Sequence, residues 1–244
     1  MANKLDTHIE IYNGGNLYDF DNGIILKWYP ERIMARCADA KSLLELGLGH
    51  GHTANIFSEN FDRYLVLDGS SAVIDNFHEK YPDCSAEIIE TYFEEFDTDE
   101  KFDVIVMGFI LEHVDDPKQI ITRYKQYLAP GGKLFIAVPN AAVMNRRLGV
   151  LAGLLDDVKT LSDFDHISGH QRYYTVETLA SEIKNAGFKV DIMEGLYLKP
   201  LTTSQMLSLN LDDKIIAGLC TLGIDYPELS CGLLAEISID PNSV

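Results

Sequence analysis

Short, nearly continuous runs of apolar residues alternate along the chain with segments in which apolar residues lie three and four positions apart. A continuous apolar run is typical of a strand buried on both faces of a parallel sheet, and the wider spacing is typical of a helix that packs on such a sheet. Their alternation predicts an α/β fold with a doubly wound sheet. The runs predict strands at residues 42–46, 64–67, 87–89, 102–107, 133–138, 188–193 and 233–239.

Segments with helical spacing follow most of these runs. The spacing extends over residues 24–38 despite Pro30, so we expect a helix there that the proline can divide in two. The sequence Pro130-Gly131-Gly132 predicts a turn that separates a helix from the fifth strand. The other helices are predicted from residue 53, after residue 71, and at 117–128, 175–186 and 203–222.

Two segments fall outside this alternation. Residues 1–23 are polar and rich in Asn, Asp, Gly and Tyr, which predicts an irregular arm that leads into the first helix. Together they form an N-terminal arm and helix, residues 1–40. Residues 139–174 mix polar and apolar positions without a clear period, which predicts a small cap insertion. We expect a single domain that spans residues 1–244, because its length and its 46% hydrophobic content suit one sizeable core.

The charge balance of the chain limits its partners. Twenty basic residues face 38 acidic ones, for a net charge of -18. Proteins bind the phosphate backbone of nucleic acids through Lys and Arg that displace counterions, so we expect no nucleic acid partner. A small-molecule substrate fits this composition better.

Cysteines and hydropathy indicate the compartment. The four cysteines form no Cys-x-x-Cys pair, which is typical of reduced, structural thiols. The first residues contain no apolar signal region, and no apolar run is long enough to span a bilayer. We therefore expect a cytoplasmic protein with no membrane partner. Its oligomeric state stays open, with a homodimer as one alternative.

A glycine-rich turn follows the first strand, with the spacing Glu45-x-Gly-x-Gly-x-Gly. Glycines at alternate positions let the backbone take torsions closed to other residues and let a ligand approach the main chain. A dinucleotide-binding motif needs glycine at position 52, where this chain has His52. Asp68, after the second strand, can accept both ribose hydroxyls of either a dinucleotide or an adenosyl cofactor, so it does not decide between them.

The order of these motifs resembles that of class I S-adenosylmethionine-dependent methyltransferases, closely over residues 41–140 and more loosely to residue 190. The resemblance implies a Rossmann-like seven-stranded sheet with an antiparallel last strand. It also implies methyl transfer from S-adenosylmethionine, which leaves S-adenosylhomocysteine. The matching motifs are Glu45-x-Gly-x-Gly-x-Gly, Asp68-Gly69-Ser70, residues 102–106, Leu111-Glu112-His113-Val114, Leu128-x-Pro130-Gly131-Gly132, Val138-Pro139-Asn140 and the stretch from His170 through Arg172 and Tyr174 to Phe188.

The same resemblance assigns residues to the cofactor. The glycine turn would pass along the methionine portion, with Glu45 toward the turn and the cofactor's amino group, and Asp68 would hold the ribose. Many relatives carry an acidic residue where this chain has Tyr92, and Glu94 is a substitute for it. The implied cofactor-binding residues are Glu45, Gly47, Leu48, Gly49, Gly51, Asp68, Gly69, Ser70, Tyr92, Phe93, Met107 and Gly108.

Methyl transfer to a hydroxyl needs a base, since the attacking oxygen must lose its proton. His113, beyond the fourth strand, is one candidate because imidazole takes a proton near neutral pH. The alternative is a structural role in the turn of the Leu111-Glu112-His113-Val114 motif. His170, in the cap, is the second catalytic candidate, and a structural role is again the alternative.

Polar residues gather in the cap, where a scaffold of this kind places its substrate contacts. His166 and His170 lie four residues apart, a spacing that allows shared metal binding, but no third ligand follows from the spacing and we expect no metal. The alternative to substrate binding is that these cap residues lie at exposed helix positions or hold loops in place. The predicted substrate-binding residues are Arg146, Arg147, His166, Arg172 and Tyr173.

These patterns together predict O-methylation of a small polar acceptor such as a sugar, a nucleotide-sugar or a related metabolite. The choice of a sugar rests on association alone: on the polar cap, and on a resemblance to methyltransferases of surface-glycan and natural-product pathways. Three alternatives stay open at this point. One is N-methylation of an amino sugar, which needs no strong base. Another is a non-catalytic protein that binds S-adenosylmethionine. The third is a dinucleotide-dependent oxidoreductase, which His52 disfavours.

Overall fold

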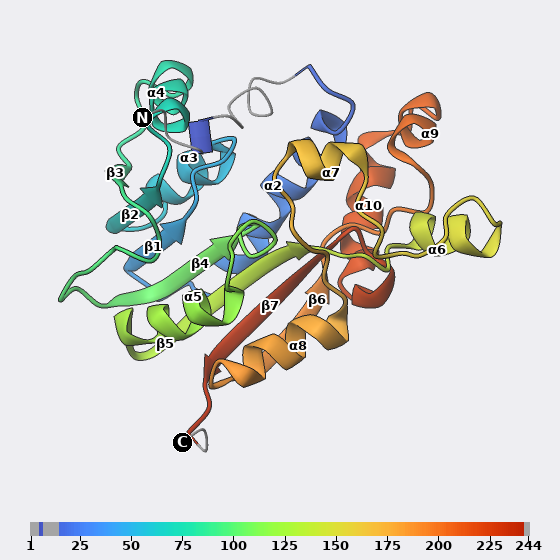
Figure 1. Ribbon diagram of the computed structural model, residues 1–244. Helices are drawn as coiled ribbons and strands as arrows, with labels where there is room; N and C mark the ends of the chain where they lie inside the picture. Colours follow the sequence, from blue (N-terminus) through green and yellow to red (C-terminus); the bar gives the residue numbers. More distant parts are fainter. Residues whose placement is uncertain (1–4, 7–14, 242–244) are drawn as a thin grey trace.

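One mixed sheet forms the centre of the protein in the computed structural model, which describes residues 5–6 and 15–241 (Figure 1). Within these residues the strand order is β3-β2-β1-β4-β5-β7-β6, and β7 is antiparallel to both of its neighbours. The α/β fold and the antiparallel last strand are therefore confirmed. The strands are β1 (Ser42–Leu46), β2 (Arg63–Asp68), β3 (Glu87–Glu90), β4 (Phe102–Gly108), β5 (Leu128–Pro139), β6 (Phe188–Gly195) and β7 (Gly232–Ile239).

The central strands are apolar throughout because both faces of the sheet are covered. Leu44 and Leu46 of β1 pack into the core on one face, while Leu43 packs into the core on the other. All three side chains are fully buried. Each such side chain contributes roughly 1.5–3 kcal/mol by leaving water. This two-sided burial explains why the strands could be read directly from continuous apolar runs.

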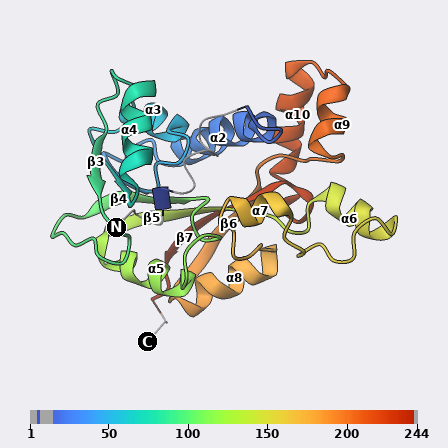
Figure 2. The same ribbon diagram turned by 45° about the horizontal axis from the view of Figure 1, so that its top comes forward.

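Helices form a layer on each face of the sheet. One layer consists of α5 (Pro117–Tyr124) and α8 (Val176–Asn185), drawn below the sheet in Figure 1. Figure 2 shows the other layer along the opposite face. That layer comprises α2 (Asp19–Met34), α3 (His52–Ser58), α4 (Ser71–Lys80), α9 (Thr203–Ser208) and α10 (Asp213–Gly223).

The N-terminal helix differs from the prediction. It begins at Asp19, so the irregular arm ends earlier than residue 23. Pro30 lies inside this single helix and is buried, and the packing of α2 on the sheet offsets the hydrogen bond that proline cannot donate. Residues 1–4 and 7–14 of the predicted arm, and residues 242–244 at the other end, lie outside the described residues.

The predicted turn at Pro130-Gly131-Gly132 is wrong, because these residues lie inside β5. Leu128 pairs with Phe102 and Lys133 with Val104, so the pairing of β5 with β4 shifts register across them. Gly131 has a φ of 79°, as expected where extra residues bulge from a strand. The predicted helix at 117–128 accordingly ends at Tyr124 and continues as a 3₁₀ helix, η2 (Lys125–Tyr127).

The cap between β5 and α8 contains two short helices, α6 (Met144–Leu151) and α7 (Asp163–Ile167). They lie beyond the carboxyl ends of the parallel strands (Figure 2). A capping box starts α7, because Ser162 and Asp165 each accept a hydrogen bond from the other's backbone N–H. The predicted helix at 203–222 is two helices, and the 3₁₀ helix η3 (Pro227–Leu229) follows them.

Within residues 5–6 and 15–241, the helices are all too short or too polar to cross a membrane.

Candidate active site

A cavity of about 1070 Å³ lies at the carboxyl ends of the parallel strands. Its size exceeds that of a typical pocket for one small ligand, which is roughly 300–1,000 Å³. Residues 47–53, after β1, line one end, which we call the cofactor half. Residues of the cap, the start of α2 and residues 199 and 202–204 line much of the rest of the cavity, which we call the acceptor half. The cavity opens between β1 and β4, where the strand order reverses and open sheets bind ligands.

The glycine turn accepts only glycine at two of its positions. Gly47 and Gly51 have φ angles of 86° and 74°, in the left-handed region. A Cβ at Gly47 would lie 2.7 Å from Ile110 Cγ2, and one at Gly51 would lie 2.5 Å from Phe77 Cδ2. The turn therefore brings bare backbone to the cavity wall just before α3 begins.

Glu45 lies beneath this turn and is 1% exposed. Thr53 Oγ1 donates to its Oε1 over 2.6 Å, and the Tyr64 hydroxyl donates to its Oε2. Burial raises the pKa of Glu45 to about 7, although these two hydrogen bonds act in the opposite direction. Glu45 thus ties β1 to β2 and α3, and its predicted contact with the cofactor's amino group stays a prediction.

Asp68 holds the other side of the turn. Its Oδ2 accepts from the Leu48 N–H over 2.8 Å and its Oδ1 from the Ser70 N–H over 2.9 Å. Burial raises the pKa of Asp68, against these backbone hydrogen bonds. Ser70 Oγ caps α4 by accepting from the Val73 N–H. The carboxylate therefore fixes the turn while it lines the cavity.

Two predicted cofactor residues lie behind the cavity wall. Met107 is fully buried in the core of the sheet, and Gly69 does not line the cavity. A Cβ at Gly69 would lie 2.7 Å from Leu5 Cδ1 and 3.3 Å from Tyr92 Cδ1. Leu5 and Tyr92 line the cavity and cover this position. The predicted cofactor residues that do line it are Glu45, Gly47, Leu48, Gly49, Gly51, Asp68, Ser70, Tyr92, Phe93 and Gly108.

The residues of the cofactor half fit S-adenosylmethionine. At Gly47 and Gly51 an added Cβ would collide with neighbouring side chains, so the main chain of the turn carries no side chain there. Asp68 presents a carboxylate beside the turn. Gly108 ends β4 next to the turn, and a Cβ there would lie 2.4 Å from the Tyr29 hydroxyl oxygen. A cofactor without phosphate needs this close backbone passage and polar anchors.

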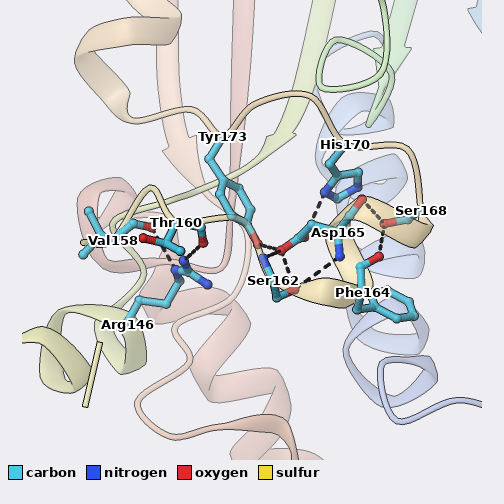
Figure 3. A network of polar contacts seen from close by, with 9 residues as sticks. All are labelled: Arg146, Val158, Thr160, Ser162, Phe164, Asp165, Ser168, His170 and Tyr173. Carbon is cyan, nitrogen blue, oxygen red and sulfur yellow. Dashed lines mark hydrogen bonds and ion pairs between the residues drawn. The ribbon is translucent and has the colours of Figure 1, made fainter. Parts of the chain in front are cut away.

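Two imidazoles meet in the acceptor half. The ring centroids of His113 and His170 lie 4.8 Å apart, with the rings edge to face. His170 Nδ1 lies 3.0 Å from Asp165 Oδ1 (Figure 3). Both histidines are predicted site residues, and the structure places them together although they are distant in the chain. Asp165, which orients His170, belongs to the polar residues of the cap but was not among the residues predicted to act in catalysis or substrate binding.

Asp165 is the centre of a polar network (Figure 3). Its Oδ2 accepts from the Ser162 N–H over 2.7 Å and from the Tyr173 hydroxyl over 2.7 Å. Burial raises the pKa of Asp165, but hydrogen bonds from His170, Ser162 and Tyr173 outweigh burial and hold the pKa well below its usual range. Asp165 is therefore a carboxylate at neutral pH. The spacing of Ser162 and Asp165 is also that of a capping box, which indicates a helix start.

Glu112 lies beneath the histidines and is 1% exposed. Burial raises the pKa of Glu112 to about 7, against the charges of His170 and Arg172. Ligand atoms of Glu112, His113 and His170 all lie within 4.8 Å of one another. His166 is exposed and does not line the cavity, so the structure does not join it to His170 as a pair. The absence of a metal stays a prediction.

The three cap arginines bind backbone carbonyls. Arg146 lines the cavity, donates to the carbonyls of Val158 and Thr160, and lies over the Tyr173 ring at 4.9 Å. Arg147 donates to Ala142 O over 2.8 Å and lies outside the cavity.

Arg172 likewise lies outside the cavity and donates to Leu111 O over 2.8 Å and to Val114 O. It therefore ties the cap to the loop that carries His113. Of the predicted substrate-binding residues, only Arg146 and Tyr173 line the cavity, because Arg147, His166 and Arg172 face other parts of the cap.

Comparison with known proteins identifies the class. A family described as "Methyltransferase domain" matches residues 25–191, more than half of the chain. The chain belongs to this family. It is an S-adenosylmethionine-dependent methyltransferase with S-adenosylmethionine as its cofactor, in agreement with the glycine turn and Asp68. The dinucleotide-dependent alternative is thereby set aside.

Individual relatives are more distant. The chain is 25% identical over 196 residues to a ubiquinone biosynthesis O-methyltransferase from Acinetobacter baumannii, which covers 78% of this chain and 81% of that protein.

Two solved structures share the fold. An N-methyltransferase from Bradyrhizobium japonicum in complex with S-adenosylhomocysteine has a TM-score of 0.54 at 16% identity, over 88% of this chain and 85% of the other. An S-adenosylmethionine-dependent methyltransferase from Mesorhizobium loti has a TM-score of 0.59 at 18% identity, over 87% and 97%.

Proposed function

We propose that this methyltransferase methylates a hydroxyl oxygen of a small polar metabolite, such as a sugar or a nucleotide-sugar. The observation that carries the proposal is the pair of His170 and Asp165 at the acceptor half of the cavity, 3.0 Å apart. A hydroxyl is a weak nucleophile until a base takes its proton, and an imidazole oriented by a carboxylate is suited to that task.

Asp165 sets the proton positions on His170. Because Asp165 is ionised and can only accept, the Nδ1 of His170 carries a proton, and this N–H donates a hydrogen bond to the carboxylate. The lone pair then lies on Nε2, which makes Nε2 the basic nitrogen. His113 packs against the same ring and is the second candidate for contact with the acceptor.

Different residues bind the cofactor and take the proton of the acceptor. S-adenosylmethionine supplies an electrophilic methyl group when it is bound. The glycine turn and Asp68 would hold the cofactor so that its methyl group lies near the acceptor oxygen. His170 Nε2 would take the hydroxyl proton as that oxygen attacks the methyl group, and breaking the bond from sulfur to the methyl carbon would leave S-adenosylhomocysteine.

N-methylation of an amino sugar is the rival proposal, because an amine can attack from its neutral form without a positioned base. A non-catalytic protein that only binds the cofactor is a further rival. The same experiment decides among the three.

Methyl transfer from isotopically labelled S-adenosylmethionine to a panel of sugars, nucleotide-sugars and their amino analogues tests the proposal. We expect a methyl ether product, and we expect His170→Gln to lower kcat by about 100-fold or more. His166→Gln is the matched control, because His166 lies in the same cap but outside the cavity.

Two results would overturn the proposal. One is a methylamine product whose formation survives both His113→Gln and His170→Gln. The other is cofactor binding without transfer to any member of the panel, which would favour the non-catalytic alternative.

A further inference from the structure

Two residues near the start of the chain lie against the cofactor half of the cavity. Leu5 and Asp6 are the described residues that precede Gly15, and Leu5 lines the cavity together with Tyr92. Both residues contact the loop that follows Asp68 at the end of β2. Neither a motif nor the resemblance assigned a role to Leu5 or Asp6.

The first residue of that loop is Gly69, and space rather than backbone conformation accounts for this glycine. The φ of Gly69 does not lie in the left-handed region, so its conformation does not require glycine. A Cβ at Gly69 would lie 2.7 Å from Leu5 Cδ1, closer than two carbon atoms pack. Leu5 therefore occupies the space that a side chain at position 69 would fill.

A ligand in this part of the cavity meets Leu5 and Tyr92 instead of Gly69. Leu5 and Tyr92 line the cavity, whereas Gly69 does not. The same Cβ would lie 3.3 Å from Tyr92 Cδ1, so the two side chains converge on the position of the missing one. Leu5 is 38% exposed and Tyr92 is 43% exposed, which leaves apolar surface that a ligand can cover.

Asp6 ties Leu5 to the start of α4. Its Oδ1 accepts from Ser70 Oγ over 2.7 Å, and the Ala72 N–H lies 3.5 Å from the same oxygen. A carboxylate is favourable beside the first turn of a helix, because the N–H groups there carry partial positive charge. Since Ser70 adjoins Gly69, this contact holds Leu5 beside the glycine.

The position along the cavity indicates which part of S-adenosylmethionine Leu5 contacts. The glycine turn is the expected wall for the methionine portion, and Asp68 is the expected partner of the ribose. Adenine and methionine are attached to opposite ends of the ribose, so the adenine extends past Asp68 toward Gly69 and Tyr92. Its two flat faces are stabilised when apolar side chains cover them and exclude water.

We propose that Leu5 packs against a face of the cofactor's adenine and takes the place of the side chain that Gly69 lacks. Asp6 is the positioning residue that holds Leu5 there through Ser70. Leu5 thus belongs to the cofactor half although it lies far from that half's motifs in the sequence. The proposal depends on the cofactor alone and goes beyond the proposed function, because it does not involve the acceptor.

Titration calorimetry with two ligands tests the role of Leu5. The ligands are S-adenosylhomocysteine and 5′-methylthioadenosine, which carries adenine and ribose but no amino acid. We expect Leu5→Ala to weaken the binding of both by the same factor of about 10, because both lose the same apolar contact. Leu222→Ala is the matched control with no expected change, because Leu222 is 44% exposed on α10 and lies outside the cavity.

A second substitution tests the shared space. Gly69→Ala places a Cβ against Leu5 Cδ1, so Leu5 must shift, and we expect both ligands to bind about 5-fold more weakly. In the Leu5→Ala protein that space is vacant, so there we expect Gly69→Ala to weaken binding less than about twofold. Equal effects in the two backgrounds would mean that the residues act independently.

Two substitutions of Asp6 test the anchor. Asp6→Asn keeps an oxygen that accepts from Ser70, whereas Asp6→Ala loses it. We expect binding of both ligands to weaken about 5-fold in Asp6→Ala and less than about twofold in Asp6→Asn. Equal losses in the two variants would contradict the positioning role.

The inference is overturned if Leu5→Ala matches Leu222→Ala, or if Gly69→Ala has the same effect with and without Leu5. It is also overturned if 5′-methylthioadenosine does not bind, or if Leu5→Ala weakens only S-adenosylhomocysteine, since Leu5 would then lie at the amino acid end. Each of these results leaves the proposed function standing, because the titrations contain no acceptor. A methylamine product would overturn the proposed function and leave the role of Leu5 intact.

Discussion

The two halves of the cavity are built in different ways. The cofactor half consists mainly of main chain at the ends of neighbouring strands, with glycines at φ angles of 86° and 74° and one carboxylate that fixes the turn. The acceptor half consists of side chains from distant segments, held by contacts such as that of Lys199 with Asp21, 178 residues apart. The main-chain geometry of the fold thus determines the donor site, whereas side chains from separate segments determine the acceptor site.

The largest effect is expected at the centre of the acceptor half. Asp165→Asn removes the carboxylate that orients the His170 ring, so kcat falls by roughly 100-fold to 1,000-fold. Affinity for S-adenosylmethionine, measured by titration calorimetry, stays unchanged because the cofactor half is intact.

Asp163→Asn is the control for that variant, since Asp163 is exposed on the same short helix. Equal rates in the two variants, or a loss of cofactor affinity in Asp165→Asn, would mean that the halves are not separate.

The next largest effect lies in the cofactor half. Gly47→Ala places a Cβ 2.7 Å from Ile110 and strains a positive φ, so affinity for S-adenosylhomocysteine falls by about 100-fold. Gly131 has a similar positive φ of 79°, but a Cβ there meets no atom within 4 Å, so Gly131→Ala destabilises the protein by about 1–2 kcal/mol without changing affinity. If both variants bind the ligand equally well, the turn is not the cofactor wall.

A pH effect on stability distinguishes Glu45 from the exposed carboxylates. The folded protein holds the Glu45 proton up to about pH 7, whereas the unfolded chain releases it near its ordinary value of 4.5. Between these values the folded state binds more protons, so stability falls as pH rises. Urea unfolding at pH 5 and pH 8 compares wild type with Glu45→Gln, which has no such proton to lose.

From pH 5 to pH 8 we expect the wild type to lose about 2 kcal/mol relative to Glu45→Gln. Glu112, whose pKa is also about 7, contributes equally to both proteins and cancels from the comparison. Parallel pH profiles for the two proteins would show that Glu45 is ionised beneath the turn.

The smallest expected effect concerns the cap arginines. Arg146→Gln loses the stacking on Tyr173 and the support of the 158–160 loop, so the KM for the acceptor rises by about 5-fold. Arg147→Gln changes it little, because Arg147 lies outside the cavity. The reverse order of effects would place the acceptor elsewhere in the cap.

The cofactor half could be predicted from the sequence more completely than the acceptor half. The first strand lies at Ser42–Leu46 as expected, because a strand covered on both faces is apolar at nearly every position. The glycine turn and Asp68 were found because a local motif encodes them. Pro130-Gly131-Gly132 has the composition of a turn but lies in β5, since pairing with β4 absorbs the extra residues as a bulge.

The residues of the acceptor half were harder to predict. His113 and His170 were named for their chemistry, but only the tertiary structure shows that their rings meet. The sequence around Asp165 fits a helix cap and gives no sign of its contact with His170. The ion pair of Asp21 with Lys199 has no local signature, because it joins segments far apart in the sequence.

A crystal structure with S-adenosylhomocysteine and a neutral sugar acceptor tests the division of the cavity most directly. We expect the cofactor to pass along Gly47–Gly51 with its ribose at Asp68. We also expect one acceptor hydroxyl within hydrogen-bond distance of His170 Nε2. An acceptor that lies outside the cap, with no contact to His170, would contradict this division of the cavity.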